Sequence, residues 1–85
     1  MSLNLDLYNL FAGKYKHFVA RSNNLHHATE ILRYQLSRVE RVFVRRELGT
    51  SDSEFAQFFE YAKKHFRCVR VTGGMIVERK PARFR

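Results

Sequence analysis

Cysteine and proline are nearly absent from the sequence. Cys68 is the only cysteine among 85 residues, so no disulfide can form within the chain and no cysteine cluster can hold zinc. A lone thiol is typical of a protein from a reducing compartment. Pro81 is the only proline. It begins a short tail, residues 81–85, which we expect to be frayed or ordered by a partner.

Long apolar runs are also missing. No segment of the chain approaches the ~18 consecutive apolar residues of a membrane-spanning helix. The first residues, Met1–Asp6, have neither the basic segment nor the apolar run of a secretory signal. The sequence therefore predicts a protein of the cytoplasm that has no membrane as its partner.

Acidic residues are scarce relative to basic ones. The chain carries 16 Lys and Arg against 8 Asp and Glu, a formal net charge of +8 at pH 7. With a membrane excluded as the partner, this net charge favours binding to nucleic acid or to an acidic protein surface.

The length of 85 residues leaves room for a single small domain, residues 1–85, and excludes an enzyme with separate substrate and cofactor domains. Apolar residues make up 45% of the chain and aromatic residues 14%, which excludes a disordered composition. The composition therefore predicts a small folded protein with one core.

Apolar residues recur at helical spacing through most of the chain. The spacing predicts a helix over residues 3–20, a second over 25–36 and a third, with an aromatic face, over 52–65. Ser51 and Glu54 form a capping box at the start of the third helix.

The segment from residue 38 to residue 48 fits two structures. Ser37 and Glu40 form another capping box, which favours a helix over 38–48 that Gly49 would end. Val42–Val44 instead has the β-branched and aromatic composition of a strand. We favour the helix and keep the strand as the alternative.

The end of the chain predicts a β-hairpin. Two β-branched runs flank Thr72–Gly74. A three-residue loop would place Val69, Val71, Met75 and Val77 on one face, and for this reason we prefer it to a two-residue Gly-Gly turn. The predicted fold is a small helix-rich α+β domain with a C-terminal β-hairpin.

The residues Val44–Ser51, followed by Phe55 and Phe58, resemble a helix-turn-helix. In that family a Leu-Gly-x-Ser turn joins two helices, and apolar residues six and nine positions after the glycine anchor the second helix, as Phe55 and Phe58 would here. With the hairpin, residues 25–80 resemble a winged helix-turn-helix domain, preceded by an N-terminal helix within residues 1–20.

This resemblance implies DNA binding, with the helix over 52–65 in the major groove and the loop 72–75 as the wing. Gln57 would match an adenine edge and Ser53 a phosphate or a guanine, so these two residues would read the bases. Domains of this kind often act as dimers, so a homodimer is expected as well.

Basic residues gather in the second half of the sequence, where we predict the phosphate contacts. On the favoured helix over 38–48, three of the arginines would share one face. The predicted contact residues are Arg38, Arg41, Arg45, Arg46, Lys63, Lys64, Arg67, Arg70, Arg79 and Lys80.

Aromatic residues at helical spacing are interpreted as core rather than as contacts for bases. Tyr34 and Tyr61 lie off the main stripes of their helices and are predicted to be exposed. The stripe assigned to the core of the first helix consists of Tyr8, Phe11, Tyr15 and Phe18.

The histidines and the cysteine give no metal or catalytic motif. His26 and His27 are adjacent, so on a helix they point about 100° apart and cannot chelate as a pair. His17 and His65 have no carboxylate or cysteine close by in the sequence. Cys68 is interpreted as a buried strand residue. We expect no cofactor, no metal and no enzymatic activity.

The sequence therefore predicts a non-catalytic nucleic-acid-binding protein with a regulatory or accessory role, and DNA as a better partner than RNA. The alternative is a small basic protein-binding module, such as a phage-encoded inhibitor, that acts on a nucleic-acid-processing enzyme. Asp52, Glu54 and Glu60 favour this alternative because DNA would repel these carboxylates.

Overall fold

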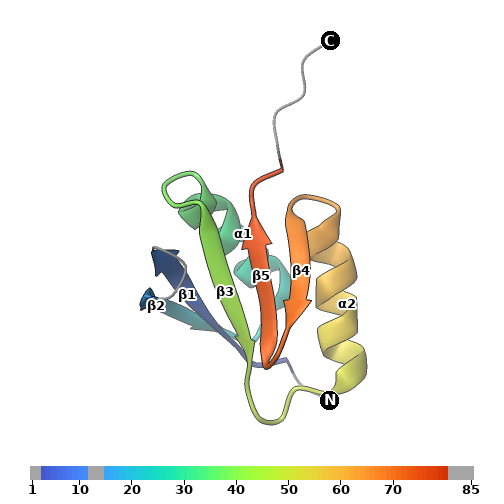
Figure 1. Cartoon of the computed structure of the whole chain (residues 1–85). Coiled ribbons are helices and arrows are strands. Elements are labelled where there is room, and N and C mark those ends of the chain that lie inside the picture. Colours follow the sequence, from blue (N-terminus) through green and yellow to red (C-terminus); the bar gives the residue numbers. More distant parts are fainter. Residues whose placement is uncertain (1–2, 12–14, 81–85) are drawn as a thin grey trace.

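The computed structural model describes residues 3–11 and 15–80, and the predicted tail, residues 81–85, lies outside this part. The described residues form five strands and two helices (Figure 1). In chain order the elements are β1 (Leu5–Phe11), β2 (Tyr15–Ser22), α1 (Leu25–Leu36), β3 (Arg41–Arg46), α2 (Asp52–Lys63), β4 (Arg67–Val71) and β5 (Gly74–Glu78). Neither helix is long and apolar enough to cross a membrane.

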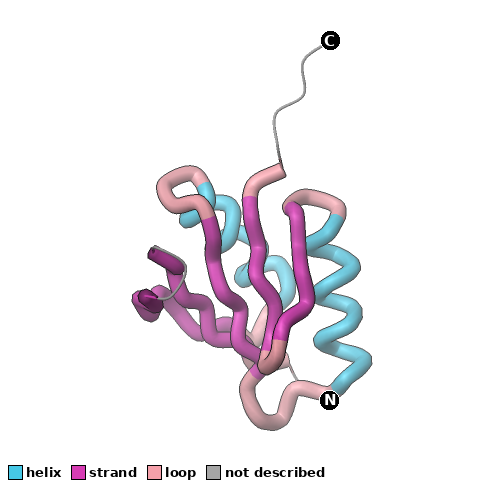
Figure 2. The backbone as a smooth tube through the Cα atoms, in the orientation of Figure 1, coloured by secondary structure: helices cyan, strands magenta, loops and turns pink. Residues whose placement is uncertain are grey.

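The strands form one antiparallel sheet in the order β2-β1-β3-β5-β4. Both helices contribute to a single core on one face of this sheet. In Figure 2 the strands β3, β5 and β4 lie in front of the helices. The opposite face of the sheet is covered by no described element, and we call it the uncovered face.

Alternation along the strands decides which side chains reach the core. Successive strand residues point to opposite faces, and Leu5 and Leu7 of β1 are fully buried, as are Val42 and Val44 of β3. The strands and helices together bury Met75, Val77, Leu32, Leu36, Phe55 and Phe58 around them. Burying a side chain of this size stabilises the fold by about 1.5–3 kcal/mol.

Both helices begin at a capping side chain, and the cap of α2 is the predicted one. The side chain of Asn24 accepts hydrogen bonds from the backbone N–H groups of His26 and His27, at 2.9 and 3.0 Å. The hydroxyl of Ser51 accepts a hydrogen bond from the backbone N–H of Glu54 at 3.1 Å. Each cap satisfies N–H groups that the first turn leaves without a partner, so the predictions of helices over 25–36 and 52–65 are confirmed.

The predicted helix over residues 3–20 is wrong, because β1 and β2 form a hairpin there. Tyr8, Phe11 and Phe18 do not form one helical stripe: Tyr8 and Phe18 pair across two strands, and Phe11 is 42% exposed. The stretch Leu3–Leu7 alternates apolar and polar residues with the period of a strand. The apolar residues that follow this stretch are also spaced as in a helix, and this spacing led to the wrong prediction of a helix.

The favoured helix over 38–48 is also wrong, and the strand alternative is correct, since β3 occupies Arg41–Arg46. Ser37 ends α1 instead of starting a helix, and its hydroxyl donates to the carbonyl of Tyr34 at 2.6 Å. Gly49, with a φ of 92°, lies in the connection from β3 to α2 and ends no helix.

These differences overturn the helix-rich, winged-helix fold. The segment that resembles a helix-turn-helix, Val44–Ser51, joins a strand to a helix, and the fold is mostly an antiparallel sheet with two helices. Only the broad α+β description fits. The cause is the apolar sequence of β3, which buries Val42 and Val44 between its neighbours β1 and β5.

The C-terminal hairpin is present, with a register different from the predicted one. Val71 pairs with Gly74, so the loop contains only two residues, Thr72 and Gly73. Val69 and Val71 therefore lie on the uncovered face, while Met75 points to the core. Gly73 adopts a φ of 83°, the left-handed conformation that glycine tolerates best, and this permits the tight loop.

Candidate functional site

The uncovered face carries three rows of side chains that cross all five strands, because the pairing places residues of one face opposite one another. The middle row is Phe18, Tyr8, Phe43, Ile76 and Val69. One flanking row is Lys16, Leu10, Arg41, Glu78 and Arg67. The other is Arg21, Asp6, Arg45, Gly74 and Val71.

Aromatic rings occupy the first part of the middle row. The ring of Tyr8 contacts that of Phe18 edge-on, with centroids 5.5 Å apart, and lies 6.1 Å from that of Phe43. The ammonium of Lys16 sits 4.5 Å from the centroid of Phe43, which is only 7% exposed. Phe18 is 52% exposed, so an aromatic surface beside a cation is accessible at this edge of the sheet.

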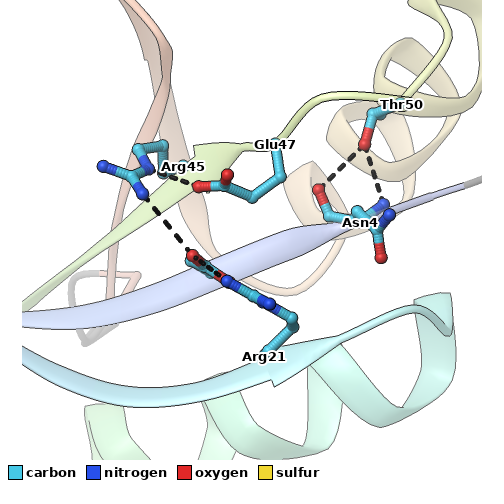
Figure 3. A network of polar contacts seen from close by, with 6 residues as sticks. Asn4, Arg21, Arg45, Glu47 and Thr50 are labelled. Atoms are coloured by element: carbon cyan, nitrogen blue, oxygen red, sulfur yellow. Dashed lines mark hydrogen bonds and ion pairs between the residues drawn. The ribbon is translucent and has the colours of Figure 1, made fainter.

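One flanking row contains a buried carboxylate held by two arginines (Figure 3). Asp6, which is 1% exposed, accepts from Arg21 at 2.7 and 3.2 Å, and Arg45 lies 3.6 Å away. Arg45 also pairs with Glu47. The hydrogen bonds from Arg21 hold the pKa of Asp6 below its ordinary value, against the opposing effect of burial.

The same end of the sheet is tied to the loop that precedes α2. The hydroxyl of Thr50 accepts from the backbone N–H of Asn4 and donates to its carbonyl, both at 2.8 Å (Figure 3). Arg46 donates to the carbonyl of Thr50 at 2.9 Å and pairs with Asp52. The arginines at this end therefore have structural partners, and their charges are largely compensated.

The opposite end of the sheet differs, because basic residues there outnumber the carboxylates, Glu40 and Glu78, which line a pocket together with Arg41 and Arg79. Arg41 begins β3, Glu78 ends β5 and Arg67 begins β4, and these three residues lie in one row. The ends of α1, α2 and β5 also meet at this end (Figure 1). We call it the cationic end and define it by basic residues that form no ion pair with any residue from 3–11 or 15–80: Arg33, Arg38, Lys64, Arg79 and Lys80.

The cationic end contains a shallow pocket of about 330 Å³. Its wall includes Arg33, His65, Arg79 and Lys80. The ammonium of Lys80 donates to the carbonyl of Lys64 at 3.3 Å, which brings these two lysines together. The pocket can therefore accept an anionic group such as a phosphate.

Four other predicted contact residues have acidic partners. Arg41 and Arg67 share Glu78, at 2.7 and 3.8 Å. Lys63 pairs with Glu60 at 3.5 Å, and Arg45 belongs to the Asp6 network described above. Lys63 and Arg45 are each matched by a carboxylate, whereas the two arginines that share Glu78 leave one positive charge in excess.

Arg70 lies against the aromatic face of α2, and so does Arg46, which also pairs with Asp52. Their guanidinium groups sit 5.7 and 5.3 Å from the ring centroid of Phe55, and Arg70 also lies 5.3 Å from that of Phe59. Both arginines thus cover the core, as long side chains with apolar stems often do.

The predicted base readers, Ser53 and Gln57, are exposed on α2. Ser53 lies 3.4 Å from the hydroxyl of Ser51, and Gln57 lines a shallow pocket at the end of the sheet opposite the cationic end. The helix-turn-helix that gave them their role is absent, and α2 also exposes Asp52 and Glu60. The structure therefore brings neither residue to the cationic end.

The remaining candidate side chains are the tyrosines, the histidines and the cysteine. Tyr34 is 58% exposed, as expected, and stacks under Arg38. Tyr61 instead contacts the rings of His26 and His65. No three histidine, cysteine, aspartate or glutamate side chains of the described chain come close enough to hold a metal ion. Burial raises the pKa of the Cys68 thiol to about 11.

Sequence reasoning missed Lys16 and Arg33, and it assigned Tyr8 and Phe18 to the core. Their positions follow from the β1–β2 hairpin, which puts Tyr8 opposite Phe18 and Lys16 opposite Leu10. The alternation of Leu3–Leu7 is the signal that would have revealed the hairpin. Arg33 carries no signal of its own apart from its place in the last turn of a predicted helix.

Comparison with protein-family models, with curated proteins and with solved structures finds no match to this chain.

Proposed function

We propose that the protein binds single-stranded nucleic acid without catalysing a reaction, and that the strand contacts the cationic end and the aromatic edge of the uncovered face. The observation that carries the proposal is the cationic end, where five basic residues form no ion pair within the described chain. A phosphate bound there releases counterions, which favours association at low salt.

The charge distribution supports this end over the rest of the surface. Arg21, Arg45 and Arg46 are held by Asp6, Glu47 and Asp52 at the opposite end. A polyanion gains little from arginines whose charge is already compensated. The backbone of a strand would therefore concentrate its contacts where the α1 and β5 ends meet.

The aromatic edge supports a single strand over a duplex. Tyr8 and Phe18 are accessible on a sheet surface, and Lys16 lies beside them. Unpaired bases stack on such rings, and each stacked base contributes about 1–3 kcal/mol. A duplex keeps its bases stacked inside and cannot use these rings.

Fluorescence anisotropy with labelled oligonucleotides tests the proposal. We expect single strands of about ten nucleotides to bind with micromolar or tighter affinity at about 50 mM salt and to weaken steeply towards about 300 mM. Duplexes of the same length should bind more weakly. Failure of single-stranded DNA and RNA to bind at low salt would overturn the proposal.

A protein-binding role is the second candidate, and one observation favours it. Val69, 50% exposed, extends the middle row of the uncovered face, and Val71, 36% exposed, ends the row of Asp6 and Arg45. The arginines of both flanking rows already have carboxylate partners. An apolar centre with a compensated charged rim is typical of a protein interface. A protein captured from nuclease-treated lysate by the wild type but not by Val69→Asp would support this role.

A further inference from the structure

A pocket of about 510 Å³ lies between the β1–β2 hairpin and the end of α1, on the other side of that helix end from the cationic pocket. Arg38, one of the residues of the cationic end, belongs to its wall. The residues that decide its chemistry are Asn9, Phe11, His17, Phe18, Gln35 and Arg38.

The wall of the pocket includes Asn9, whose side chain has a buried polar atom without a partner. Asn9 is 8% exposed, and its side-chain N–H donates to the Oε1 of Gln35 at 2.9 Å. This bond orients the amide, and the Oδ1 of Asn9 is left buried without a hydrogen bond to any described residue. A buried acceptor without a partner is unfavourable, and a ligand that donates an N–H to it would remove this penalty.

The other groups of the pocket suit a nucleotide. Phe11, on the same face of β1 as Asn9, is 42% exposed, and its ring can stack against a planar base. Arg38 donates one hydrogen bond to the hydroxyl of Tyr34 at 2.9 Å, and a guanidinium has further N–H donors for a phosphate. A ring for stacking, an acceptor for a base N–H and a donor for a phosphate thus occur in one pocket.

We infer that this pocket binds an unpaired nucleobase with an exocyclic amino group, whose N–H donates to the Oδ1 of Asn9. Adenine, cytosine and guanine carry such a group, and thymine and uracil do not. The inference rests on the proposed function and adds a base preference to it. In a duplex each base is stacked between its neighbours and cannot enter a pocket, so the pocket selects single strands.

Affinities for labelled oligo-dC and oligo-dT of equal length test the inference. The wild type should bind oligo-dC about fivefold more tightly than oligo-dT, which is the ratio that one neutral hydrogen bond gives. Asn9→Ala should remove this preference. Asn23→Ala, at an exposed asparagine away from the pocket, is the matched control and should keep the preference.

A second measurement uses the unaltered protein, in case Asn9→Ala fails to fold. The side-chain amide resonances of Asn9 should shift on addition of oligo-dC and move much less with oligo-dT. Equal affinity of the wild type for the two oligonucleotides would overturn the base preference and leave the proposed function intact. Absence of binding to either would overturn both.

Discussion

The carboxylate of Asp6 accepts two hydrogen bonds from the guanidinium of Arg21 on the neighbouring strand, at 2.7 and 3.2 Å. The side chain of Arg21 is 66% exposed and that of Asp6 only 2%. A buried charge on the uncovered face is therefore held by a partner in contact with water. This relationship compensates the charge at one end of the sheet and leaves the opposite end cationic.

The Asp6–Arg21 pair predicts a loss of stability in acid. The folded-state pKa of Asp6 lies below its ordinary value of 3.8. The stabilisation is therefore complete above that pH and disappears as pH falls through the lower, folded-state pKa. The free energy of unfolding of the wild type should exceed that of Asp6→Asn at neutral pH. The difference should shrink below about pH 4, as followed by chemical denaturation. A difference that does not change with pH would contradict the pairing.

Gly74 is predicted to be irreplaceable in β5. A Cβ at this position would lie 2.0 Å from the backbone carbonyl oxygen of Val44, and neither strand can give way without losing the β3–β5 pairing. Gly74→Ala should lower the free energy of unfolding by about 3 kcal/mol. The neighbouring Gly73 has open space, so Gly73→Asn, which tolerates a positive φ, should cost less than about 1 kcal/mol. Equal losses for the two variants would contradict this account.

Cys68 is predicted to react slowly in the folded protein. Burial raises the pKa of its thiol to about 11, so at pH 8 almost none of it is the reactive thiolate. Alkylation by iodoacetamide at pH 8 should be much slower for the folded chain than for the chain unfolded in guanidinium chloride. Equal rates would show that the thiol is not packed against the core.

Phe18 is predicted to serve binding more than folding. Its ring is half exposed, so Phe18→Ala should lower the free energy of unfolding by only about 1 kcal/mol, mainly through the lost contact with Tyr8. The same change should weaken binding to single-stranded DNA about tenfold. Val69→Ala, in the same row and equally exposed, is the control and should leave the affinity nearly unchanged. An equal effect of both substitutions would argue against stacking on Phe18.

The two helices could be predicted from the sequence because their signals are local. Asn24 and Ser51 are capping residues next to amphipathic segments, and Ser51 caps α2 as expected. The β1–β2 hairpin could not be recognised by the same method, since Leu7 and Tyr8 fit a helical stripe and a strand equally well. What decides in favour of the strand is the pairing of Leu7 with Val44, far along the chain, which no local pattern contains.

The candidate site, like the fold, could be predicted only where the signal is local. The excess of basic residues was evident from composition, and Arg38, Lys64, Arg79 and Lys80 were expected as contacts. Which arginines are compensated could not be read from spacing, because Asp6 meets Arg45 only through the pairing of β1 with β3. The aromatic edge could not be predicted for the same reason, because it depends on the pairing of β1 with β2.

The salt dependence of binding to a single-stranded oligonucleotide tests the central claim most directly. Each phosphate contact contributes about 0.7 to the slope of log K against log salt for a single strand, so Arg33→Gln/Lys80→Gln should lower the slope by about 1.4. Arg45→Gln/Arg46→Gln removes the same charge from the compensated end and should leave the slope unchanged, with folding checked by circular dichroism. Equal slopes for the wild type and both variants would contradict binding at the cationic end.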